Sequence, residues 1–170
     1  MTRMVQMCAA LIVIGFLVWL VVPSEEIGSQ RAIVDEVSCL VGECREIGDQ
    51  PIMVKGKCLV WNMSNNYRSN VCARLPKEML GCSSDCELTV FMVMPIRKEI
   101  VGHIVQTRRP IYRRYVDIYV AYWPEKEPAG THTIEWNDTV RPPQVRYNPN
   151  YLESFERPLA EWIKGLPRKG

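Results

Sequence analysis

Cysteine is the residue type in this sequence whose number and spacing could do chemistry. Six of the seven cysteines lie within residues 39–86: Cys39, Cys44, Cys58, Cys72, Cys82 and Cys86. An even number of clustered cysteines in an exported domain is typical of disulfide bonds. The sequence therefore predicts three disulfides among these six residues, and several pairings stay open.

A metal site is the alternative use of the same thiols. Two closely spaced pairs, Cys39 with Cys44 and Cys82 with Cys86, could supply thiolate ligands. The chain's only histidines, His103 and His132, could complete a zinc site. Only one of the two pairs has the spacing of a structural zinc knuckle, so disulfides are favoured. The sequence has no Cys-x-x-Cys pair, which argues against a thioredoxin-like redox function.

The histidines give little sign of nucleophilic catalysis. A serine or cysteine nucleophile usually needs a histidine base that a third group holds in place. Neither His103 nor His132 lies in a recognisable motif, and the sequence has no Gly-x-Ser-x-Gly, phosphate-loop or dinucleotide-binding pattern. We therefore expect a protein that is not an enzyme and uses no cofactor. An enzyme or metal-binding protein with a site built from dispersed Cys and His residues is the alternative.

A run of basic residues is the most suggestive surface feature. Six cations lie within residues 97–114, against one carboxylate, Glu99: Arg97, Lys98, Arg108, Arg109, Arg113 and Arg114. Arginine binds carboxylates and phosphates through paired hydrogen bonds, so the run could bind an acidic protein or lipid head groups. It could instead neutralise the acidic segment 24–50 of the same chain. A net charge of only +2 does not favour a nucleic-acid partner.

The N-terminal segment predicts a membrane anchor. Residues 4–22 carry no charge, and about 20 apolar residues suffice to cross a lipid bilayer. Arg3 precedes this segment and Glu25 and Glu26 follow it, which predicts a cytoplasmic N-terminus and a domain on the other side of the membrane. A cleaved signal peptide, which would release a secreted binding module, is the alternative. Two asparagines fit the glycosylation pattern: Asn62 and Asn137.

Hydrophobic periodicity divides the rest of the chain into a helical part and a strand-rich part. The acidic segment 24–50 has apolar residues at helical spacing, which predicts an amphipathic helix over residues 30–41. Alternating or apolar runs predict strands over residues 53–62, 88–94, 100–107, 111–123 and 131–136. The tail from Pro124 is rich in proline and can hold only short elements, with a short helix expected over residues 159–165.

The clearest alternation lies within residues 112–123. One face of this strand should point to the core: Val116, Ile118, Val120 and Tyr122. The other face, with Tyr115, Asp117, Tyr119 and Ala121, should be exposed or covered by the tail. Together the elements predict a β-dominated α+β fold, a single small antiparallel-sheet or sandwich-like domain over residues 51–170. The sequence thus indicates a membrane-anchored accessory or interaction protein with its domain outside the cytoplasm.

Overall fold

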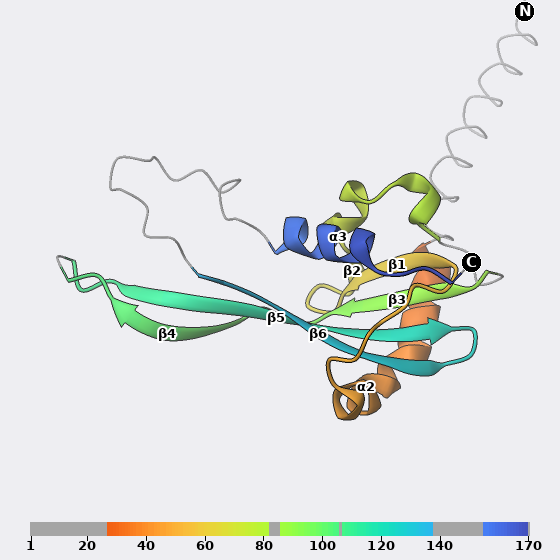
Figure 1. Ribbon diagram of the computed structural model, residues 1–170, viewed down its shortest axis with the longest axis horizontal. Helices are drawn as coiled ribbons and strands as arrows, with labels where there is room; N and C mark the ends of the chain where they lie inside the picture. Colours follow the sequence, from red (N-terminus) through yellow and green to blue (C-terminus); the bar gives the residue numbers. More distant parts are fainter. Residues whose placement is uncertain (1–26, 82–85, 106, 138–154, 170) are drawn as a thin grey trace, which may run out of the picture.

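One sheet forms the centre of the molecule, with helices on both of its faces (Figure 1). The computed structural model of the chain describes residues 27–81, 86–105, 107–137 and 155–169. Residues 27–37 are helical, and the elements that follow are η1 (Ser38–Leu40), α2 (Val41–Ile47), β1 (Lys57–Asn62), β2 (Tyr67–Arg68), η2 (Asn70–Arg74), η3 (Lys77–Met79), β3 (Leu88–Val93), β4 (Arg97–His103), β5 (Pro110–Trp123), β6 (Glu127–Asn137) and α3 (Glu156–Gly165).

The sheet has six strands and is mixed. β1 runs parallel to β3, whereas the pairs β1–β2, β3–β5, β4–β5 and β5–β6 are antiparallel. β6 follows β5 over residues 113–122 and so occupies one edge of that strand. β3 and β4 must therefore follow one another along the opposite edge, with Pro95 between them.

The α+β class expected from the sequence is confirmed, but the expected antiparallel or sandwich-like arrangement is wrong. The chain between β1 and β3 is long enough to return to the starting end of β1, and this permits the parallel pair. Helices cover the sheet where a sandwich would place a second sheet. In the described part of the chain no helix is long and apolar enough to cross a bilayer. The expected anchor, residues 4–22, lies outside that part.

The helical segment 27–47 packs on one face of the sheet, which we call the α2 face. Its apolar positions are buried at the spacing that predicted a helix: Ile33, Val34, Val37, Leu40 and Cys44. The helix begins by residue 27 and continues beyond the expected end, through η1 into α2. Gly48 ends α2 in a left-handed conformation that favours glycine, with φ of +74°.

The opposite face, which we call the α3 face, is covered by α3 and η2. Leu159, Ala160 and Ile163 of α3 are buried in one cluster with Val116, Ile118 and Val120 of β5. The core face expected for β5 is confirmed for these three residues. The expectation for the other face is wrong at Tyr119 and Ala121, since the segment 27–47 buries both. The alternation of a strand shows that two faces exist, but it does not show which element covers each face.

Part of the sheet projects beyond the helices and forms an arm (Figure 1). We define the arm as β4, the turn that follows it, residues 110–117 of β5 and residues 133–137 of β6. β1 pairs with β3 only as far as Asn62 and Val93, so β4 lies beyond the last residue of β1. Every residue of β4 is exposed or half-buried. Val116 and Ile134, at the root of the arm, are buried in the core cluster of the α3 face. The other described residues of the arm are exposed or half-buried, so the described helices leave most of the ribbon open.

Candidate functional site

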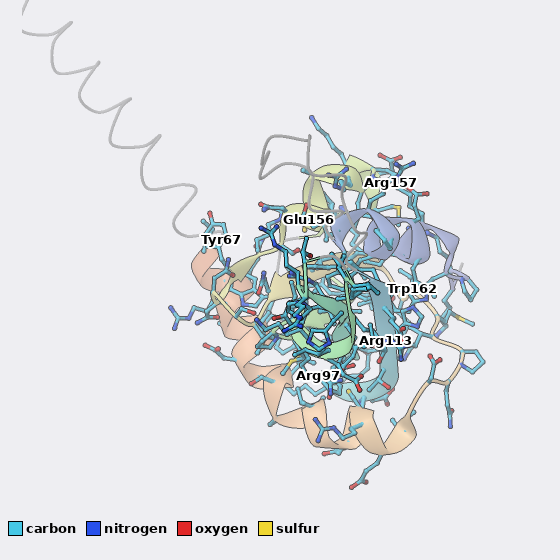
Figure 2. All side chains as sticks on the ribbon, turned by 90° about the vertical axis from the view of Figure 1, so that its left-hand side faces the viewer. Tyr67, Arg97, Arg113, Glu156, Arg157 and Trp162 are labelled. Atoms are coloured by element: carbon cyan, nitrogen blue, oxygen red, sulfur yellow. The ribbon has the colours of Figure 1, made fainter. Side chains whose placement is uncertain are left out.

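The basic run identified in the sequence lies in the arm. Arg97 and Lys98 belong to β4, Arg108 and Arg109 to the turn, and Arg113 to β5, with Arg114 beside it. Figure 2 looks along the arm from its tip and shows Arg97 and Arg113 in front of the sheet. The antiparallel register places all six cations on one ribbon, although up to 17 positions separate them in the sequence. Arg97 and Arg113 lie on one face of the ribbon, Lys98 and Arg114 lie on the other face, and Arg108 and Arg109 lie at its tip.

On the α2 face of the arm, two of these arginines form ion pairs with carboxylates of the arm itself. Arg113 Nε lies 3.0 Å from Glu135 Oε1, and the side chain of Arg97 pairs with Asp117. Arg97 also lies over the ring of Tyr115, 4.8 Å from its centre. These contacts order the side chains along the ribbon and neutralise part of its charge.

The acidic segment does not neutralise the basic run in the described part of the chain. Its carboxylates pair elsewhere: Asp35 with Arg31, Glu36 with Lys126, and Asp49 with His132. Internal neutralisation by this segment was one interpretation of the two oppositely charged regions. Arg97 and Arg113 of the basic run instead pair with carboxylates inside the arm.

The tip of the arm carries cations that have no ion pair among the described residues. Arg108 and Arg109 are exposed. Their backbone closes the turn, since Arg108 N donates to Ile104 O at 2.7 Å and Ile104 N donates to Arg109 O at 2.8 Å. Arg108 has a φ of +52°. The turn holds two adjacent guanidinium groups away from the body, where a partner can reach them.

Apolar side chains are also exposed along the arm, from the start of β4 to the turn at the tip. Six large hydrophobic residues are exposed in the described part of the chain, and four of them lie in or next to the arm: Ile96, Ile100, Val101 and Val105. Val105 is 91% exposed and Ile100 is 53% exposed. Exposed apolar groups that are rimmed by polar residues are typical of interaction surfaces.

A cavity of about 550 Å³ lies where the arm joins the body, on the α2 face. Arg45 of α2 forms one wall, and Arg97 and Asp117 of the arm form the other. Tyr119, at the floor, accepts hydrogen bonds from Arg45 Nη2 at 3.0 Å and from Arg45 Nε at 3.3 Å. The bond to Tyr119 raises the pKa of Arg45 above its ordinary value. Sequence reasoning missed this cavity, because Arg45 is only one more charge in an acidic segment.

Four of the described cysteines are free thiols: Cys39, Cys44, Cys58 and Cys72. The fifth, Cys86, is half-buried just before β3. Cys82 lies outside the described residues, and the prediction of three disulfides stays a prediction. The sheet separates Cys44, on the α2 face, from Cys58 and Cys72 on the α3 face. Burial raises the pKa of Cys44, and it raises that of Cys58 to about 11. Both thiols are therefore protonated at neutral pH.

The histidines lie apart, and the described residues contain no group of three or more His, Cys, Asp or Glu side chains that could hold a metal ion. His103 is exposed at the end of β4. His132 stacks on Trp162 of α3 with 4.1 Å between ring centres, and its Nδ1 lies 3.6 Å from Asp49. This position fits a packing role between the edge strand and the helix.

The two asparagines of the glycosylation pattern lie at strand ends. Asn62 ends β1, and its side-chain oxygen accepts a hydrogen bond from Ser64 N at 2.9 Å. Asn137 ends β6 opposite Arg113. Whether either one carries a glycan stays a prediction.

Comparison with known proteins adds no family. No protein-family model matches the chain, and no curated protein is significantly similar to it. The functional argument therefore rests on the arm and on the cavity at its root.

Proposed function

We propose that this chain is a membrane-anchored, non-enzymatic interaction protein whose arm docks on an acidic surface of a partner outside the cytoplasm. One observation carries the proposal: the arm combines exposed aliphatic side chains with cations that the described residues leave without an ion pair, at Arg108 and Arg109. Protein interfaces join an apolar centre to a polar rim and are enriched in arginine. The proposed anchor is the apolar segment 4–22.

The projecting shape of the arm supports docking over a purely structural role. β4 buries none of its residues fully, so it adds little to the hydrophobic core. Edge strands of a sheet usually carry charged side chains that prevent pairing with a second chain. In β4 the exposed residues Lys98 and Glu99 can have this effect. Ile100 and Val101 follow them directly and are exposed. Their apolar surface has a physical explanation if a partner covers it.

The test is crosslinking and affinity recovery of the full chain from native membranes, with mass spectrometry of the partners. The arm variant carries Arg108→Gln and Arg109→Gln. The matched control carries Lys77→Gln and Arg157→Gln, which remove the same charge from two exposed side chains of the body (Figure 2 labels Arg157). We expect the arm variant to recover severalfold less partner, with a stronger effect at low salt, and the control to match the wild type.

If the wild type and the arm variant recover the same partners in equal amounts, the proposal is overturned. A second variant, Ile100→Ser with Val105→Ser, tests the apolar part of the surface. Both side chains are largely exposed, so the melting temperature should change little. Recovery of the partner should nevertheless fall, because the apolar contact is lost.

The location of the domain is tested separately. A reporter that is active only in the cytoplasm, fused after Gly170, should give no signal. N-terminal sequencing of the membrane fraction should find residues 4–22 retained. A mature chain that starts near Glu25 and stays soluble after a carbonate wash would replace the anchored protein with a secreted binding module.

A further inference from the structure

We propose that the cavity at the root of the arm binds a carboxylate group of the acidic partner, between the guanidinium groups of Arg45 and Arg97. This inference rests on the proposed function, because the ligand belongs to the partner that the arm recognises. The cavity opens on the same face of the arm as Arg97 and Arg113. An extended acidic segment that follows this face toward the body would bring a carboxylate into the cavity.

Arg45 is held ready to bind an anion. A neutral hydroxyl, that of Tyr119, fixes its orientation through two hydrogen bonds. In the described part of the chain no carboxylate forms an ion pair with Arg45. A guanidinium has five N–H donors, and Tyr119 takes only two of them. The Tyr119 hydroxyl accepts both bonds and keeps its own hydrogen, which it can donate to the same ligand.

The charge in the cavity favours one negative charge. Arg97 and Arg45 contribute two positive charges, and Asp117 contributes one negative charge. One oxygen of Asp117 accepts from Arg97, and the other accepts from Thr133 Oγ1 at 2.8 Å. The carboxylate of Asp117 is thus occupied on both sides, and the cavity keeps a net charge of +1. A singly charged carboxylate balances that net charge, whereas a doubly charged phosphate would leave one negative charge in excess beside Asp117.

The walls of the cavity are fixed relative to one another. Thr131 N, in β6, donates to Gly48 O at the end of α2 at 2.9 Å. The backbone approaches so closely at this junction that a Cβ atom on Gly130 would lie 2.9 Å from Gly48 O. α2 is therefore held in one position on β6, and Arg45 faces the floor of the cavity from a rigid element. Sites built on such elements lose little free energy in ordering when a ligand binds.

The experiment measures binding of a fluorescein-labelled octaglutamate peptide to the purified full chain, with an octaglutamine peptide as the uncharged control. We expect Arg45→Gln to weaken octaglutamate binding by about tenfold. Arg45→Lys, which keeps the charge but loses the planar donors, should restore only part of the affinity. The matched control is Arg31→Gln, an exposed arginine of the same helical segment that lies outside the cavity, and it should bind as the wild type does.

A second measurement uses the wild-type chain and so does not require that any variant folds. In the wild-type chain, the side-chain Nε–H resonance of Arg45 should shift when the octaglutamate peptide is added, and it should not shift with octaglutamine. Acetate should compete with the peptide better than inorganic phosphate does. Stronger competition by phosphate, corrected for ionic strength, would overturn the assignment of a carboxylate ligand.

The outcomes separate this inference from the proposed function. If Arg45→Gln binds octaglutamate as the wild type does, while Arg108→Gln with Arg109→Gln weakens binding, the tip alone recognises acidic groups. The cavity inference then falls and the docking arm stands. If neither change affects octaglutamate binding and the arm variant recovers the same partners from membranes, both proposals fall.

Discussion

The two halves of β5 share one strand and one alternation of side chains, yet they lie in opposite surroundings. Residues 118–121 are buried, because β3 and β6 flank them and helices cover both faces. Residues 110–115 pair with β4 and are exposed or half-buried. A regular strand can therefore belong to the core over one half of its length and to an interaction surface over the other.

Different forces stabilise the two halves. Burial of a large aliphatic side chain in the body contributes about 1.5–3 kcal/mol. In the arm, cross-strand pairs such as Arg113 with Glu135 contribute roughly 0.2–1 kcal/mol each. The arm can consequently change its side chains with little effect on the stability of the body. This difference makes the arm suitable for recognition, and it can be tested by matched substitutions.

The largest contrast is expected for two isoleucines on the same face of the sheet, one in each region. Ile118 is fully buried, and Ile118→Ala should lower the free energy of unfolding by about 2–5 kcal/mol because it leaves a cavity in the core. Ile100 is 53% exposed, and Ile100→Ala should lower it by less than about 0.5 kcal/mol. Urea unfolding of the purified full chain, followed by tryptophan fluorescence, measures both values. Equal losses would show that the arm is part of the core.

Two glycines at irregular positions of the sheet give the next contrast. Gly130 has a φ of +132° and lies against Gly48, so Gly130→Ala should cost about 1–3 kcal/mol through backbone strain and a close contact. Gly102, at the irregularity in β4, has room for a Cβ, whose nearest neighbour would be Ile111 at 4.0 Å. Gly102→Ala should be neutral or slightly stabilising, because alanine restricts the unfolded chain. The same urea unfolding curves decide between these expectations.

The sequence predicted the buried elements best, because their signal is local. Apolar periodicity placed the helix around Ile33, the strand around Val90 and the short helix around Leu159, and all three are present. β4 was expected to begin at Ile100, but it begins at Arg97. Charged side chains in an exposed ribbon leave no apolar alternation to detect, so the signal is weakest where the functional surface lies.

Tertiary relations could not be predicted from these patterns. The parallel pairing of β1 with β3 depends on how the chain between them returns, and that path has no periodic signal. The cavity combines Arg45 with Tyr119, which lie 74 positions apart in the sequence. Only the packing of α2 on the sheet brings them together. The basic run was visible in the sequence, whereas its internal partners Asp117 and Glu135 were not.

The pH dependence of stability tests the buried thiol of Cys58 in the body. The pKa of Cys58 is about 11 in the folded chain, above the ordinary value of 9.0. As the pH rises, the thiol of Cys58 therefore loses its proton in the unfolded chain before it does so in the folded chain. The contribution of this thiol to stability is complete below pH 9 and is lost as the pH rises toward 11. Under reducing conditions, the free energy of unfolding should fall by about 1 kcal/mol between pH 8 and pH 10 through this group.

The Cys58→Ala variant isolates this effect from the other groups that titrate in the same range. Its stability should depend less steeply on pH than that of the wild type. If the free energy of unfolding depends on pH equally steeply in the wild type and in Cys58→Ala, burial does not raise the pKa of Cys58. A wild-type slope that appears only after reduction would show that Cys58 is disulfide-bonded in the native chain.

The smallest expected effect concerns two arginines of the arm that differ in their partners. Arg113 pairs with Glu135 at 3.0 Å, and a double-mutant cycle with Arg113→Gln and Glu135→Gln should give a coupling free energy of about 0.2–1 kcal/mol. This coupling should fall when the salt concentration is raised to about 1 M, because both side chains are partly exposed.

Arg109 has no ion pair among the described residues, so Arg109→Gln should leave the unfolding curve unchanged while it weakens partner binding. A coupling above the stated range would mean that the ribbon depends on its ion pairs for stability. A stability loss for Arg109→Gln would mean that the tip has an internal role, and the separation between a structural body and a recognising arm would then fail at its outermost residue.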